Sequence, residues 1–123
     1  MKYSDDYLGH VLKSYIECAL WVTFDFDDFE LNVNEASMLK AKADIKGFLD
    51  DVPENDIYPS QMGHDLFLTR NKHAAGFWDR HLEEKEPALR LVKEKLGNEL
   101  TELADNLGEV DVYVGDDGLV VIE

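Results

Sequence analysis

The strongest constraint on the fold is an apolar repeat in the last third of the chain. Six aliphatic residues recur at intervals of three and four positions: Leu89, Val92, Leu96, Leu100, Leu103 and Leu107. This spacing places them along one side of an α-helix, which must bury that side against other elements. Pro87 suits a first helical position, and Gly108 suits the position just beyond a last turn. We therefore predict a long amphipathic helix over residues 87–107.

A β-hairpin is predicted directly after this helix. Residues 110–114 and 119–123 are rich in valine and isoleucine, and Gly115-Asp116-Asp117-Gly118 stands between them. An Asp-Gly pair between two such runs is a strong short-range hairpin signal. Because two strands alone are only marginally stable in water, helices must cover them.

Three further helices are expected earlier in the chain. Ser4 and Asn34 are good N-cap residues for two of them, and Pro53 ends the second. Residues 61–71 can form the third, with Ser60 as its cap. The fold class is therefore α+β, with about four helices and a small C-terminal antiparallel hairpin. The length of 123 residues fits a single domain over 1–123.

The charge balance indicates the kind of partner. Twelve Lys and Arg against 27 Asp and Glu give a net charge of −15. Such a chain repels nucleic-acid phosphates and anionic membranes, so we expect neither direct nucleic-acid binding nor membrane binding. A protein partner with a basic surface is expected instead, although acidity that serves only solubility remains an alternative. The carboxylates predicted to form the binding surface are Asp25, Asp27, Asp28, Glu30, Asp50, Asp51, Glu54 and Asp56.

The cellular compartment is predicted from the cysteine content and the first residues. Cys18 is the single cysteine, so no intramolecular disulfide can form, which suits a reducing cytosol. The first residues carry acids where a signal peptide needs a basic lead, and no run approaches the roughly 18 apolar residues of a membrane span. We expect a cytoplasmic protein.

No metal or other cofactor is predicted. The acidic run that begins at Asp25 does not fit a calcium-binding loop, because Glu30 stands where glycine is needed and Ala36 where the bidentate glutamate is needed.

Side chains able to do chemistry are densest between residues 64 and 80. The candidate polar cluster comprises His64, Asp65, Arg70, Asn71, His73, Asp79 and Arg80. If these groups converged, the two histidines and an aspartate could bind a metal or share a proton, while an arginine neutralised an anionic substrate. The motif signal for such an enzyme is weak, because the chain has no H-E-x-x-H, P-loop, G-x-S-x-G or paired cysteines.

A structural interpretation of the same segment competes with catalysis. Arg70 and Arg80 would pair with nearby acids, and Asn71 would cap the end of the third helix. Phe77 and Trp78 would anchor in the core, with Gly76 before them allowing a close turn.

The run G-H-D-L-F-L-T-R-N-K-H-A-A-G-F-W-D-R over residues 63–80 also carries a resemblance. Together with G-E-V-D-V-Y-V-G-D-D-G-L-V at 108–120 and Y-I-E-C-A-L-W at 15–21, it resembles a family of small acidic proteins of tailed bacteriophages. The chain departs from the family block where Lys72 and Ala74 replace glycines and Leu66-Phe67 replaces an aromatic pair. The resemblance implies a phage or prophage origin and a location in the host cytoplasm, and it implies no biochemical activity.

The sequence thus favours a protein that acts by binding a host or phage protein. The sharpest form of this hypothesis is a DNA mimic, whose carboxylates occupy the basic groove of a nuclease, restriction or other defence enzyme. Two alternatives stay open: a small-molecule or metal-dependent enzyme that uses the segment from His64 to Arg80, and a non-catalytic phage accessory protein. The partner and the oligomeric state stay open as well.

Overall fold

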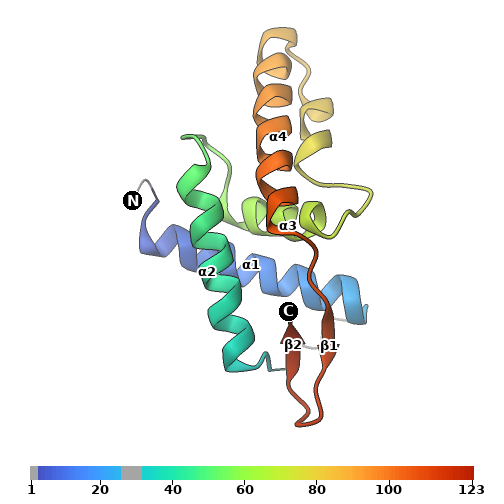
Figure 1. Cartoon of the computed structure of the whole chain (residues 1–123). Coiled ribbons are helices and arrows are strands. Elements are labelled where there is room, and N and C mark those ends of the chain that lie inside the picture. Colours follow the sequence, from blue (N-terminus) through green and yellow to red (C-terminus); the bar gives the residue numbers. More distant parts are fainter. Residues whose placement is uncertain (1–2, 26–31) are drawn as a thin grey trace.

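The computed structural model describes residues 3–25 and 32–123, and it confirms the α+β class (Figure 1). In chain order the elements are α1 (Asp5–Phe24), α2 (Glu35–Asp51), α3 (Pro59–Arg70), the 3₁₀ helix η1 (Phe77–Glu83), α4 (Pro87–Leu107), β1 (Val112–Val114) and β2 (Val120–Ile122). Four α-helices and the hairpin correspond to the predicted elements, and η1 is an additional helix that the sequence pattern did not indicate. No described helix is long and apolar enough to cross a membrane.

The predicted caps of α1 and α2 are confirmed. The side chain of Ser4 accepts a hydrogen bond from the Tyr7 N–H at 3.1 Å, and that of Asn34 accepts one from the Ser37 N–H at 2.8 Å. The prediction that Ser60 caps α3 is wrong. This helix begins at Pro59, without a side-chain cap. Because proline has a helical φ and no N–H to satisfy, it can open the helix two residues earlier than expected.

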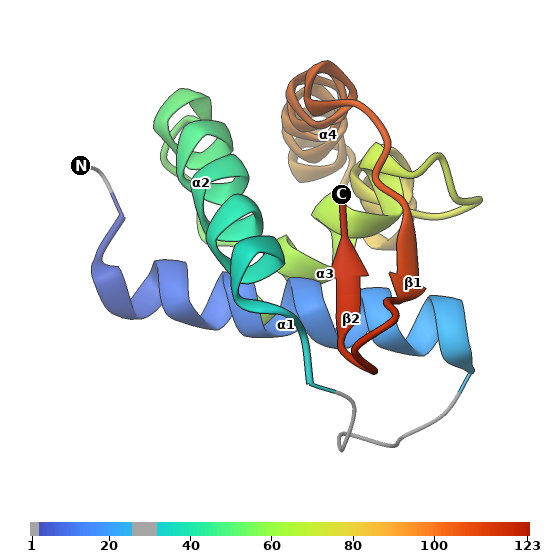
Figure 2. The ribbon, with the colours of Figure 1, turned by 60° about the horizontal axis from the view of Figure 1, so that its bottom comes forward.

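The core is built where α3 crosses α1 (Figures 1 and 2). A Cβ atom added to Gly63 would lie only 2.2 Å from the backbone oxygen of Val11, so this crossing requires glycine in α3. One helical turn further along both helices, the rings of Tyr15 and Phe67 pack edge to face, with their centroids 5.5 Å apart. The close contact between α1 and α3 therefore forms the centre of the core, and the other elements pack around it.

The hairpin packs against the helical core through β2. Val112 lies opposite Ile122 and Val114 opposite Val120 in antiparallel register. The other edge of β2 bonds the residues that precede α2, because the Asn34 N–H donates to the backbone oxygen of Val120 at 2.8 Å. Being bonded on both sides, β2 buries Val120 and Ile122, whereas β1 lies at the edge and is more exposed. Figure 2 shows the hairpin standing beside the first turn of α2.

The long helix α4 belongs to the core only in its C-terminal half. Leu100 of the predicted apolar repeat is buried there, as is Ala104, which is not part of the repeat, whereas Leu89 and Val92 of the repeat are exposed. The N-terminal half rises away from the rest of the molecule, and η1 runs alongside it (Figure 1). Gly97 allows this pairing, because a Cβ atom at that position would lie 2.5 Å from the backbone oxygen of Phe77. The apolar repeat therefore continues onto a part of the helix that leaves the core.

Candidate functional site

The polar segment 64–80 is held together by a buried ion pair. Asp65 on α3 is completely buried, and its two oxygens accept from Arg80 on η1, from Nε at 2.9 Å and from Nη2 at 2.6 Å. The hydrogen bonds to Asp65 raise the pKa of the Arg80 guanidinium. This bidentate geometry fixes the position of η1 on α3. Both groups satisfy each other, and neither is free to act on a substrate.

Arg70 is a second buried cation, only 2% exposed. Its Nη1 donates to the Tyr15 hydroxyl at 3.0 Å and to the Asp44 carboxylate at 3.1 Å. Its Nε and Nη2 donate to the backbone oxygens of Gly108 and Leu107, at 2.8 and 3.1 Å. The last carbonyls of a helix lack partners within the helix and carry its negative dipole end, so a cation there is doubly favourable. Arg70 thus joins all four α-helices, and the expected pairing of both arginines with acids is confirmed.

The other short polar side chains of the segment form hydrogen bonds with the backbone of the chain around α3. Asn71 is the C-cap of α3, as expected, and its amide also donates to and accepts from the backbone of Val110 at 3.1 and 2.8 Å. Asp79 accepts from the Gly76 N–H at 3.3 Å. Sequence reasoning missed Thr69, whose hydroxyl oxygen accepts from the Phe77 N–H at 3.2 Å. These contacts connect α3 to the hairpin and to η1.

The two histidines do not complete a metal or proton-transfer site. His64 lies edge-on to Trp21 of α1, with ring centroids 6.5 Å apart, whereas His73 lies beside Phe67, 6.2 Å away. Within residues 3–25 and 32–123, no three side chains of histidine, cysteine, aspartate or glutamate are grouped so as to hold a metal ion. The members of the candidate polar cluster thus contact different partners: Asp65 pairs with Arg80, Arg70 with Tyr15 and Asp44, and each histidine lies beside a different aromatic ring.

One expectation about the aromatic pair needs correction. Phe77 is buried, but Trp78 is 42% exposed and is not a core anchor. The reason is the 3₁₀ geometry of η1, in which consecutive side chains point about 120° apart. When Phe77 faces the core, its neighbour must face another direction.

The described acids of the predicted surface lie at two separate places in the molecule. Asp27, Asp28 and Glu30 lie outside the described residues, and Asp25 is the C-cap of α1. The other four predicted acids lie at the end of α2: Asp50 and Asp51 are its last two residues, and Glu54 and Asp56 follow it. Hydrogen bonds from the Tyr3 hydroxyl to the backbone of residues 52 and 53 place that end beside the start of α1. Since α1 has 20 residues and is about 30 Å long, its C-cap Asp25 lies at the opposite end of this helix from that group.

Two further acids join the group at the start of α1. Asp5 and Asp6 occupy its first turn, where the helix dipole favours negative charge. We call the six residues Asp5, Asp6, Asp50, Asp51, Glu54 and Asp56 the acidic end. All six are exposed, and none has a lysine or arginine partner within 4 Å among the described residues. The sequence did not indicate that Asp5 and Asp6 belong to the acidic surface, because the start of α1 and the end of α2 are brought together only by a tertiary contact.

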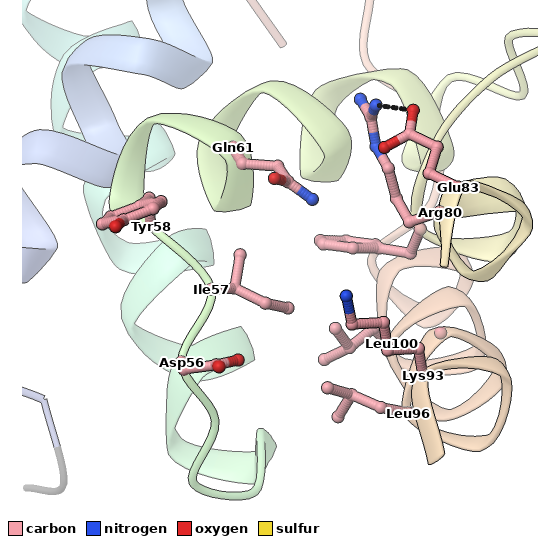
Figure 3. A pocket seen from close by; sticks show the side chains of 11 residues that line it. Asp56, Ile57, Tyr58, Gln61, Arg80, Glu83, Lys93, Leu96 and Leu100 are labelled. Atoms are coloured by element: carbon pink, nitrogen blue, oxygen red, sulfur yellow. Dashed lines mark hydrogen bonds and ion pairs between the residues drawn. The ribbon is translucent and has the colours of Figure 1, made fainter. Parts of the chain in front are cut away.

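A pocket of about 400 Å³ adjoins the acidic end at Asp56. It lies between the α2–α3 connection and α4, and Figure 3 shows Ile57 on one side facing Leu96 and Leu100 on the other. Arg80 and Lys93 contribute the cations of its rim. Both already have ion-pair partners, because Arg80 pairs with Asp65 and Lys93 Nζ lies 2.7 Å from Glu84. The pocket can receive an apolar group, but it presents no free pair of catalytic side chains.

Comparisons of the chain with protein-family models, with curated proteins and with solved structures found no match. The acidic end and the pocket are therefore the features of this chain on which a function can be built. Both are suited to contact another macromolecule, because one offers unpaired charge and the other offers apolar surface.

Proposed function

We propose that the chain is a protein-binding module whose acidic end occupies a basic surface of a host or phage protein. The observation that carries this proposal is the gathering of six exposed carboxylates where α1 begins and α2 ends, with no lysine or arginine within 4 Å of them among the described residues. Carboxylates of this kind attract a basic surface over several ångströms and align it during encounter. The net charge of −15 acts in the same direction.

The sharpest form of the proposal is DNA mimicry. The acidic end would take the place of phosphates in the groove of a nucleic-acid-processing or defence enzyme, such as a restriction nuclease, in the host cytoplasm. The support is the unpaired charge, together with the resemblance of residues 63–80 to a phage family. The division of the predicted acids supports one mimic surface made by the acidic end, rather than one that spans from Asp25 to Asp56.

The first experiment is capture of partners from a host lysate by the tagged chain. At about 50 mM salt we expect a basic nucleic-acid enzyme to be retained, and at about 200 mM salt we expect it to be released, because phosphate-like contacts weaken steeply with salt. Duplex DNA should compete with the chain for this enzyme. If every retained protein resisted both salt and DNA, the proposal would be rejected.

Two charge-matched variants locate the binding surface. The first carries Asp50→Asn, Asp51→Asn and Glu54→Gln at the acidic end. The second carries Glu109→Gln, Asp111→Asn and Asp116→Asn at the hairpin, so both variants remove three exposed charges. Loss of the partner only in the first variant supports the acidic end. Equal loss in both would mean that net charge alone binds, which contradicts a defined surface.

A further inference from the structure

The part of the chain that rises from the core carries an exposed apolar surface. We call residues 77–96, comprising η1 and the N-terminal half of α4, the arm. Ten large hydrophobic side chains are exposed in the described chain, and half of them lie on the arm: Trp78, Leu82, Leu89, Leu91 and Val92. Contiguous exposed apolar surface on a small protein marks an interaction site.

The apolar face of the arm continues the stripe that builds the core. Leu89, Val92 and Leu96 share one side of α4 with Leu100, which is buried lower down. Val92, by contrast, is 65% exposed, and the described residues do not cover it. The pocket beside Leu96 and Leu100 lies at the base of this stripe (Figure 3). Open apolar surface therefore extends from Leu89 to the floor of the pocket.

The net charge of the arm indicates which partner can bind its apolar surface. Residues 77–96 contain five Lys and Arg and five Asp and Glu, so the arm has no net charge and the whole excess of −15 lies elsewhere. A strongly basic partner gains nothing from a neutral surface. A second copy of the chain, in contrast, brings the same apolar stripe and the same mixture of both signs. In a two-fold arrangement the exposed cations Lys85, Arg90 and Lys95 of one arm can face acids of the other arm.

From this combination we propose that the arm binds a second copy of the chain, with the α4 stripes of the two copies packed across a two-fold axis. The interface is isologous, so each apolar residue is buried in both copies. The charges outside the arm repel each other in such a dimer. Added salt screens this repulsion and strengthens self-association, whereas it weakens the binding of a basic partner by the acidic end. The sign of the salt effect thus separates the two interactions.

The test is sedimentation of the full chain across concentration, at low and at high salt. We expect a species of twice the 14.1 kDa chain mass that becomes more populated as salt rises. Val92→Glu should weaken self-association about 100-fold, which is about 2.7 kcal/mol, because it removes apolar contact and places like charges across the axis. Circular dichroism establishes that the variant is folded, which its exposed position allows.

The matched control is Leu39→Glu, which introduces the same charge at a similarly exposed leucine (62%) on α2, outside the arm. We expect its self-association to stay within about twofold of the original chain. A monomer at about 100 µM under both salt conditions would overturn the proposal. So would equal weakening by the two variants. A monomeric chain whose Val92→Glu variant lost a lysate partner would assign the arm to a different protein, and this also counts against a second copy.

Discussion

The polar segment 64–80 and the acidic end are alike in sequence, since both are dense in charged side chains, but they are opposite in environment. Asp65 is completely buried and doubly bonded to Arg80, whereas Asp50 is exposed and has no cation within 4 Å among the described residues. A buried charge must be paired within the fold, because desolvation without a partner costs several kcal/mol. An exposed charge keeps its water and remains available to another molecule. Density of polar residues therefore does not by itself locate a binding site.

The largest expected effect tests the buried side of this comparison. Arg80→Ala leaves Asp65 buried without its partner, so we expect the free energy of unfolding to fall by about 3 kcal/mol, at the low end for a buried pair because Arg80 is partly exposed. Urea unfolding measures the change. Glu83→Ala is the control, since it removes an exposed partner of the same arginine at 3.5 Å and should cost less than about 0.5 kcal/mol. Equal costs would show that Asp65 does not depend on Arg80.

A glycine pair tests the helix crossing beneath the polar segment. Gly63→Ala forces a Cβ atom against the Val11 backbone, so we expect a loss of about 1–3 kcal/mol in stability. Gly9→Ala, in the open on α1, should instead stabilise the chain by up to about 1 kcal/mol through helix propensity. Thermal unfolding of the two variants gives opposite signs if α3 lies as close to α1 as the structure has it.

Alkaline pH tests the same buried region without a charge mutation. Burial raises the pKa of the Cys18 thiol from 9.0 to about 12, and the nearby Asp65 carboxylate adds to the shift. Above pH 9 the unfolded chain loses this proton while the folded chain keeps it. Stability should therefore fall as pH rises, by at most about 1.4 kcal/mol per pH unit from this group until about pH 12. Cys18→Ala should flatten the slope of unfolding free energy against pH, and an unchanged slope would contradict the assignment.

The smallest effect tests the exposed side. Asp50 and Asp51 lie in the last turn of α2, where the dipole disfavours negative charge. Replacing either by asparagine should stabilise the chain by about 0.3–1 kcal/mol at low salt, while it weakens binding of a basic partner. Glu35→Gln, in the first turn of the same helix, should destabilise by a similar amount. High salt should abolish both differences, and differences that persisted would point to a cause other than charge.

Local chemistry explains which elements could be predicted. Ser4 and Asn34 cap their helices within three residues of sequence, and the Asp-Gly turn closes strands that are neighbours in the chain. Such features depend on short-range hydrogen bonds and backbone preferences, so one sequence contains them in full. The η1 helix was missed because it is fixed by distant contacts, through Asp65 and through the close approach of Gly97.

The candidate site depended on tertiary structure to a greater degree. The sequence determined the net charge, the apolar repeat of α4 and the segment in which polar side chains concentrate. Only the fold decided that the end of α4 and the Tyr15 hydroxyl enclose Arg70. It also decided that the start of α1 lies beside the end of α2 and that Val92 stays uncovered. The physical reason is that burial depends on which distant surfaces meet. The periodicity of the sequence specifies which side of a helix is apolar. How much of that side is buried depends on where the neighbouring helices end.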